Sequence, residues 1–213
     1  MQWRTRSIVT LVALVAIPAA TATACASDDA SPGEDRWRGA RLETPVARPD
    51  FTLLDTQGES FDFRARTAGT LTFLFFGYTN CPDVCPIHMR GLGRVIARFP
   101  HDVRSRVHVV FVTTDPDRDT PDRMREWLDD MGSGFTGLRG SIDDVNAIQT
   151  GLGLPPAVAA WPAADSTAYA VGHAAQVLAF TPDDSAHFAY PFGTREQDWM
   201  HDLPRLLRLS GNR

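Results

Sequence analysis

The chain has 213 residues, of which 43% are hydrophobic and 22% are charged, and its formal net charge is -5. These values fit one globular domain with its own hydrophobic core, and they exclude a disordered chain or an integral membrane bundle. All 21 basic residues are arginine. The acidic balance argues against a nucleic-acid-binding surface, which requires clustered positive charge.

The N-terminus has the pattern of a targeting segment. Two early arginines precede an apolar run from Ile8 to Ile17, and small residues lead from there to Cys25. The run is about half of the ~20 residues that a membrane-spanning helix needs. Residues 1–24 are therefore predicted to be a secretory signal peptide. Ala-Thr-Ala before Cys25 resembles a bacterial lipobox, which predicts a lipid anchor on Cys25 at the outer face of the cell membrane. The alternative is a plain signal peptide cleaved near Ala24.

Residues 25–48 are rich in Ser, Asp, Pro, Gly and Arg and have few large apolar groups. Such a segment cannot bury enough surface to offset the entropy that it would lose on folding. We predict a flexible tether over residues 25–48, followed by a folded domain over residues 49–213.

Several segments of the domain have clear β or α patterns. Residues 51–55 and 60–63 flank a Gly-containing turn and predict a β-hairpin. The apolar run 70–76 predicts a central strand buried on both faces. Apolar residues recur at helical spacing over 84–99. Further strands are predicted at 107–113, 136–139, 169–171, 173–181 and 186–190, with helices at 120–131, 141–151 and 195–209. Residues 157–167, rich in Ala and Pro, are predicted to form a surface loop.

The order of these elements predicts an α/β layered fold in which helices link parallel central strands by right-handed crossovers. A strand, a cysteine-bearing loop and then a helix is the thioredoxin arrangement. We therefore expect a thioredoxin-like fold with an added N-terminal β-hairpin and a late β-hairpin.

The chemistry is predicted to reside in Cys81-Pro-Asp-Val-Cys85, which follows the central strand and begins the helix. Cysteines at positions i and i+4 lie on one face of a helical turn. A helix N-terminus favours thiolate over thiol because its free N–H groups stabilise negative charge. Two adjacent thiolates suit Cu(I) strongly, and they would also suit a disulfide.

Three interpretations of this pair compete. A structural disulfide is common in secreted proteins, but one that closes so small a loop stabilises little. A redox dithiol usually has C-x-x-C spacing, which is one residue shorter than the spacing found here. A metal site needs at least one further ligand when the metal is Cu(II).

The third ligand would have to be a His or Met near the helix start, and six histidines are available. His88 lies three residues after Cys85, and its side chain could face either way. His101, His108, His187 and His201 are expected to be surface or edge residues. His173 begins a late predicted strand, and in a thioredoxin-like sheet the loop before that strand lies against the cysteine-bearing turn.

Two motifs extend the pattern: Phe-Phe-Gly-Tyr-Thr-Asn-Cys-Pro-Asp-Val-Cys-Pro at 75–86 and Thr-Asp-Pro-Asp-Arg-Asp-Thr-Pro at 114–121. With a late His173 before an apolar strand and a Pro-Asp turn, the chain resembles the Sco/SenC family of copper-binding proteins over roughly residues 49–209. The resemblance implies copper bound by Cys81, Cys85 and His173. The family usually has Asp directly before the histidine, where this chain has Gly172.

The resemblance further implies an extracytoplasmic copper metallochaperone, which is not an enzyme. It would help to mature the dinuclear copper centre of cytochrome c oxidase, with the copper-bearing oxidase subunit as partner and another copper donor protein as a second candidate partner. The alternative is a thiol–disulfide oxidoreductase in which Cys81 and Cys85 cycle, and a peroxidase is a third hypothesis. In the second motif, we expect Asp115 and Asp119 to cap the loop and the next helix, and Arg118 to pair with an acid.

Overall fold

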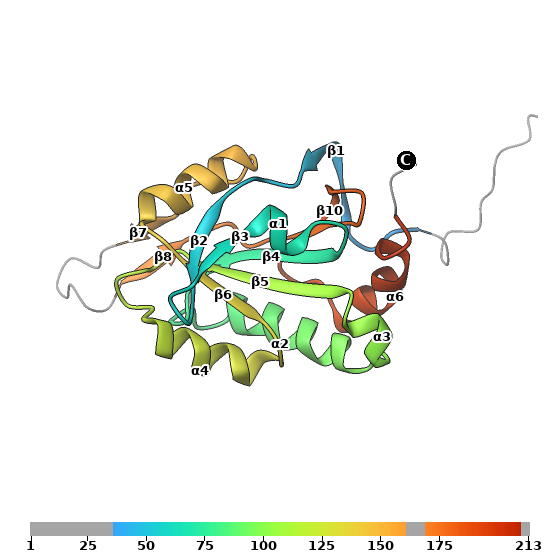
Figure 1. Cartoon of the computed structure of the whole chain (residues 1–213), viewed down its shortest axis with the longest axis horizontal. Helices are drawn as coiled ribbons and strands as arrows, with labels where there is room; N and C mark the ends of the chain where they lie inside the picture. Colours follow the sequence, from blue (N-terminus) through green and yellow to red (C-terminus); the bar gives the residue numbers. More distant parts are fainter. Residues whose placement is uncertain (1–35, 161–168, 210–213) are drawn as a thin grey trace, which may run out of the picture. The chain divides into compact units, whose positions relative to one another are not determined.

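The computed structural model describes residues 36–160 and 169–209 (Figure 1). An eight-stranded sheet has the order β1-β10-β9-β4-β5-β6-β2-β3, and β7 and β8 form a separate ribbon. The strands are β1 (Ala40–Ala47), β2 (Thr52–Asp55), β3 (Ser60–Asp62), β4 (Leu71–Gly77), β5 (Val107–Thr113), β6 (Thr136–Arg139), β7 (Val158–Ala160), β8 (Ala170–Gly172), β9 (Val177–Phe180) and β10 (Ser185–Tyr190). The helices are α1 (Phe63–Thr67), α2 (Val84–Ala97), α3 (His101–Arg104), α4 (Pro121–Met131), α5 (Ile142–Gly151) and α6 (Glu196–Leu206).

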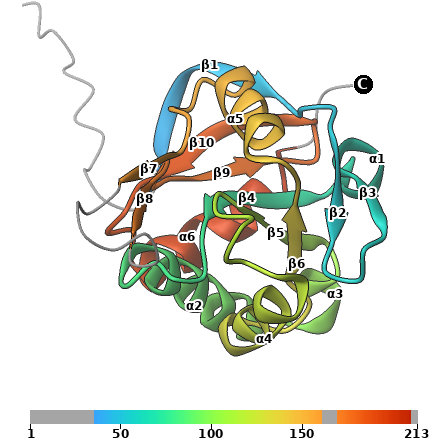
Figure 2. The ribbon, with the colours of Figure 1, turned by 90° about the vertical axis from the view of Figure 1, so that its left-hand side faces the viewer.

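The centre of the sheet is β4, which is parallel to β5 and antiparallel to β9. Every residue of β4 is buried, as its unbroken apolar sequence predicts. Successive side chains of a strand point to opposite faces. Phe73 and Phe75 accordingly enter one core with α2, α4 and α6, while Leu74 and Phe76 enter the other with α1 and α5. Figure 2 shows α2, α4 and α6 on one side of the sheet and α5 on the other.

Both predicted hairpins are present, because β2 pairs with β3 and β9 pairs with β10, each antiparallel. The predicted ranges of β5 and β6 match the observed strands, and those of α4 and α5 match to within one residue at each end. Two short helices, α1 and α3, were not expected. Each is five residues or fewer, too short to have a recognisable apolar period.

The predicted tether over residues 25–48 is wrong for its last part. Residues 40–47 form β1, which pairs antiparallel with β10 at the edge of the sheet. Most of its side chains are exposed and it contains Pro45, so it shows no strand-like alternation. Proline is tolerated in edge strands, where its missing N–H breaks no central hydrogen bond. The predicted signal peptide, Cys25 and the first part of the predicted tether, up to residue 35, lie outside the described residues.

Polar anchors at both ends hold β1 in place. Before the strand, the backbone N–H groups of Arg38 and Gly39 donate to the buried carboxylate of Asp202. After it, the Arg48 side chain is fully buried and its Nε donates to Asp184 at 2.8 Å. The guanidinium also donates to four threonines: Thr67, Thr70, Thr72 and Thr181. A buried cation is stable only when its donors are satisfied in this way.

The segment before β9 also differs from prediction. Val158–Ala160, expected in a surface loop, forms β7 and pairs with β8; residues 161–168 lie outside the described residues. The strand predicted at 173–181 begins only at Val177, because the chain must leave the ribbon after Gly172 before it can join the main sheet. His173 therefore lies in a connecting loop. In the part of the chain that the structure describes, no helix is long and apolar enough to cross a membrane.

Candidate metal centre

The two cysteines lie at the junction of β4 and α2. The chain turns directly after Gly77, and Asp83 caps α2 by accepting a hydrogen bond from the N–H of Val84. A Cβ on Gly77 would lie 2.7 Å from the Cys85 sulfur, so only glycine permits this close approach. Cys81 is 7% exposed and Cys85 is fully buried, and neither forms a disulfide. The local fold thus places two sulfurs side by side at a helix start.

His173 completes a cluster with these sulfurs. Its Nε2 atom lies 3.5 Å from the Cys85 Sγ, and the ligand atoms of Cys81, Cys85 and His173 all lie within 4.8 Å of one another. Nδ1 lies 3.0 Å from the carbonyl oxygen of Ala174. A hydrogen bond from Nδ1–H to this carbonyl leaves the Nε2 lone pair facing the sulfurs, which is the tautomer that a metal requires.

The two thiols have opposite electrostatic environments. A hydrogen bond from the Cys85 thiol is the main cause that lowers the pKa of Cys81 to about 4, against the opposing effect of burial, and backbone N–H groups add to the lowering. Burial, together with the adjacent Cys81, raises the pKa of Cys85 far above its usual range. At neutral pH the metal-free pair is therefore one thiolate and one thiol. Binding a metal through both sulfurs requires Cys85 to release its proton.

The other described histidines do not join the cluster. His88 is buried, and its Nε2 lies 3.2 Å from the carbonyl oxygen of Ala175, in the loop that carries His173. His187 pairs with Asp183, and His201 contacts the buried Asp202. Among the described residues, the Cys81, Cys85 and His173 cluster is the one group of its kind that could hold a metal ion.

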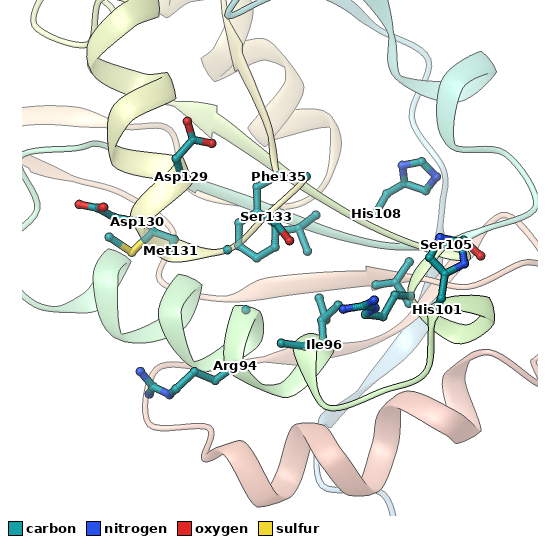
Figure 3. A pocket seen from close by; sticks show the side chains of 17 residues that line it. Arg94, Ile96, His101, Ser105, His108, Asp129, Asp130, Met131, Ser133 and Phe135 are labelled. Atoms are coloured by element: carbon teal, nitrogen blue, oxygen red, sulfur yellow. The ribbon is translucent and has the colours of Figure 1, made fainter.

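A cavity of about 570 Å³ lies at the opposite end of α2 from the cysteines. Figure 3 shows the side chains that line it. Residues of α2, α3, β5 and the loop after α4 line it, including His101 and His108. The eleven residue-to-residue steps from Cys85 to Ile96 span about 16 Å of helix. The cavity and the cluster of two cysteines and one histidine are therefore separate places in the fold.

The second motif supplies no ligand, and part of its predicted role is wrong. Thr120, not Asp119, caps α4 by accepting from the N–H of Arg123. Asp119 is instead fully buried and accepts hydrogen bonds from Thr79 and Thr113.

Asp115 was also predicted to cap the loop, but its carboxylate accepts hydrogen bonds from the side chains of Arg118 and Tyr169. Arg118 pairs with an acid as predicted, since its Nε donates to Asp115 at 2.5 Å. Thr79 and Tyr169, the partners of Asp119 and Asp115, were not predicted from the sequence. A hydrogen bond between residues 40 or 54 positions apart leaves no periodic signal in the sequence.

Comparison with known proteins places these features in context. The family model for SCO1/SenC matches residues 40–208. The solution structure of apo Sco1 from Thermus thermophilus has a TM-score of 0.71 and 29% identity, and it covers 81% of this chain and 98% of that one. ScoI of Bradyrhizobium japonicum, solved with copper bound, has a TM-score of 0.65 and 26% identity, and it covers 76% of this chain and 99% of that one. These likenesses confirm the predicted thioredoxin-like fold.

Among curated proteins, the mitochondrial SCO2 homolog of Bos taurus is 28% identical over 184 residues. The match covers 84% of this chain and 66% of the bovine protein. The chain spans a smaller share, 41%, of the sco1 protein of Schizosaccharomyces pombe.

Proposed function

Because the chain belongs to the SCO1/SenC family and ScoI of Bradyrhizobium japonicum was solved with copper bound, we propose that this chain carries copper through Cys81, Cys85 and His173. The observation that carries this proposal is the convergence of three ligand atoms within 4.8 Å. They come from a helix start and a loop that lie 88 residues apart. Soft sulfur ligands beside an imidazole suit copper in both of its common oxidation states.

The chain's own groups prepare this site. Cys81 is already a thiolate at neutral pH, and Cys85 supplies the second sulfur once it loses its proton. The rings of Phe75 and Tyr78 pack edge-to-face with the His173 ring, at centroid distances of 5.9 and 5.6 Å. Two thiolates suffice for Cu(I), whereas Cu(II) prefers an additional nitrogen ligand.

Copper titration of the reduced protein tests this set of ligands. Cys81→Ser and Cys85→Ser should weaken both Cu(I) and Cu(II) binding, and His173→Ala should weaken Cu(II) by more than about tenfold. His101→Ala is the matched control, because His101 is exposed and lines the separate cavity. Unchanged Cu(I) and Cu(II) affinity in His173→Ala would remove the histidine from the site.

BsSco, a protein of similar structure, is a member of the Sco family of cytochrome c oxidase assembly proteins. We extend the proposal to a metallochaperone that receives copper from a donor protein and delivers it to the copper-bearing oxidase subunit. A strain that lacks this protein should assemble the oxidase without its dinuclear copper centre. Restoration by wild type but not by Cys85→Ser would link that defect to the site. Full oxidase copper content in the deleted strain would refute delivery.

The same proposal places the domain outside the cytoplasm. Residues 1–24 would direct secretion, and a lipid on Cys25 would hold the protein at the outer face of the cell membrane. Mass spectrometry of the membrane fraction tests this directly. A mature N-terminus at Cys25 with a diacylglycerol mass supports the anchor, and an unmodified N-terminus at Cys25 or Ala26 excludes it.

One observation favours a second candidate function. The pair combines a thiolate at Cys81 with a protonated thiol at Cys85, which suits thiol–disulfide exchange as well as metal binding. In a reductase, the Cys81 sulfur would attack a substrate disulfide, and Cys85 would then displace the reduced substrate and close a Cys81–Cys85 disulfide. Catalytic turnover of a disulfide substrate by the copper-free protein, with an external thiol as reductant, would favour this role.

A further inference from the structure

One loop touches both of the segments that carry the candidate copper ligands. This loop, residues 114–120, follows β5 and contains the second sequence motif. It supplies no ligand of its own. Its two buried aspartates, Asp115 and Asp119, contact different segments, and each contact lies a few residues before a ligand.

Asp119 fixes the segment that leads into Cys81, here called the cysteine side. Its carboxylate accepts hydrogen bonds from the Thr79 N–H at 3.0 Å and from the Thr79 hydroxyl at 2.5 Å. It also accepts from the hydroxyl of Thr113, at the end of β5. Arg123 of α4 donates to the same Thr79 hydroxyl and to the side chain of Asn80. The two residues directly before Cys81 are thereby fixed to β5 and α4.

Asp115 fixes the segment that leads into His173, here called the histidine side. It accepts a hydrogen bond of 2.6 Å from the Tyr169 hydroxyl, and Tyr169 lies four residues before His173. The Arg118 guanidinium carbon lies 3.5 Å from the centre of the Tyr169 ring, while its Nε donates to Asp115. One face of the Tyr169 ring and its hydroxyl are thus both held by the loop.

This attachment matters because the main sheet does not hold the histidine segment. β8, which joins Tyr169 to His173, pairs only with β7, over three residue pairs. A two-stranded ribbon of this length has little stability of its own. Contacts outside the ribbon must therefore help to set where His173 lies relative to the sulfurs.

We propose that loop 114–120 is a positioning element that sets the distance between the cysteine pair and His173, with Asp119 holding one side and Asp115, through Tyr169, the other. The inference rests on the proposed copper site. It gives the second motif a role that is neither metal ligation nor helix capping. Loosening the histidine side should impair binding that needs the imidazole, and it should spare binding that two sulfurs support.

The substitution Tyr169→Phe tests this most cleanly, because it removes the hydroxyl and keeps the ring beside Arg118. Using the full chain in reduced form, we expect Cu(II) affinity to fall about tenfold, the scale of loss when an outer contact of a metal ligand is removed. Cu(I) affinity should change less than about twofold, since two thiolates suffice for that ion. The Cu(II) electron paramagnetic resonance spectrum should also change.

Tyr190→Phe is the matched control. Tyr190 also donates its hydroxyl to a buried aspartate, Asp202, at 2.9 Å, and it packs in the core against Trp199. It should lower thermal stability without altering the ratio of Cu(II) to Cu(I) affinity. A role of Tyr169 in stability alone would give the same result as this control.

Three outcomes are distinguishable. If His173→Ala weakens Cu(II) binding but Tyr169→Phe leaves affinity and spectrum unchanged, the positioning role is overturned. If His173→Ala has no effect, the proposed copper site fails instead. Should Tyr169→Phe unfold, Asp115→Asn provides the second variant, because an amide NH2 group replaces one of the two oxygens that accept from Tyr169 and Arg118 and should shift the affinity ratio in the same direction. An unchanged ratio in folded Asp115→Asn would also overturn the role.

Discussion

The Nε2 atom of His173 lies 3.5 Å from the sulfur of Cys85, although 88 residues separate the two positions. Cys85 is fixed within α2, whose first turn packs against the end of β4. His173 lies in a loop between a small ribbon and the main sheet. Half of the site is therefore built on a rigid helix and half on a segment that depends on side-chain contacts. This difference underlies the predictions that follow.

Cys81 should react with iodoacetamide at a rate that hardly depends on pH between roughly pH 5.5 and 7.5. Its pKa is lowered to about 4, chiefly by the hydrogen bond from Cys85, so the reactive thiolate is fully formed throughout this range. In Cys85→Ala, which has no donor for that hydrogen bond, the rate should rise with pH. Mass spectrometry after timed alkylation measures both. A steep increase with pH in the wild type would contradict the assigned thiolate.

Asp119→Asn should lower the free energy of unfolding by about 2 to 3 kcal/mol, the cost of leaving buried hydrogen-bonding groups unsatisfied. The carboxylate accepts from both Thr79 and Thr113, whereas an amide would turn a donor toward one of them. Urea denaturation measures the change. Asp122→Asn, on the exposed face of α4, is the control and should cost less than about 1 kcal/mol.

The same Asp119→Asn variant should weaken Cu(I) and Cu(II) alike, because it loosens the cysteine side that both ions need. Tyr169→Phe should weaken Cu(II) alone. Competition titrations with a chelator of known affinity compare the two variants. Identical profiles for both variants would show that the loop does not act separately on the two sides.

Gly172→Asp should fold normally and bind Cu(II) more tightly than the wild type. The nearest atom to a Cβ at this position is the carbonyl oxygen of Val158 at 3.6 Å, an ordinary contact, so the side chain fits. A carboxylate next to His173 raises the basicity of the imidazole, and we expect a gain of roughly threefold to tenfold at low salt. Gly172→Asn has nearly the same shape without the charge. Equal affinities for the Asp and Asn variants would rule out this electrostatic effect.

Truncation tests whether β1 belongs to the domain. A chain that starts at Trp37 should retain full stability, because Trp37 packs on Phe188 and β1 remains. A chain that starts at Pro49 loses β1 and the buried Arg48 with its hydrogen bonds. We expect it to lose at least about 4 kcal/mol, the range in which several buried interactions fail together. Thermal unfolding of the two chains compares them, and equal melting temperatures would make β1 dispensable.

Much of the fold was predictable because its central elements carry strong local signals. The unbroken apolar run of β4 and the periodic apolar face of α2 predict their own burial. The placement of Cys81 and Cys85 side by side was predictable, because their spacing at a helix start puts them on one face of the helical turn. In contrast, β1 is mostly exposed and depends on Arg48 and Asp202, polar residues whose role appears only when distant segments meet.

The same limit applies around the site. The contacts from Asp119 to Thr79 and from Asp115 to Tyr169 join residues 40 and 54 positions apart. Composition and periodicity describe neighbours along the chain, so they predict neither contact. They also placed His173 within a strand, whereas the change of sheet between β8 and β9 leaves it in a loop.

The most direct test of the central claim is the ligand set of the copper-loaded protein. X-ray absorption of the Cu(II) form should show two sulfur donors and at least one imidazole nitrogen, and His173→Ala should lose that nitrogen while keeping both sulfurs. A wild-type spectrum without sulfur donors, or one that His173→Ala leaves unchanged, would contradict copper binding by Cys81, Cys85 and His173.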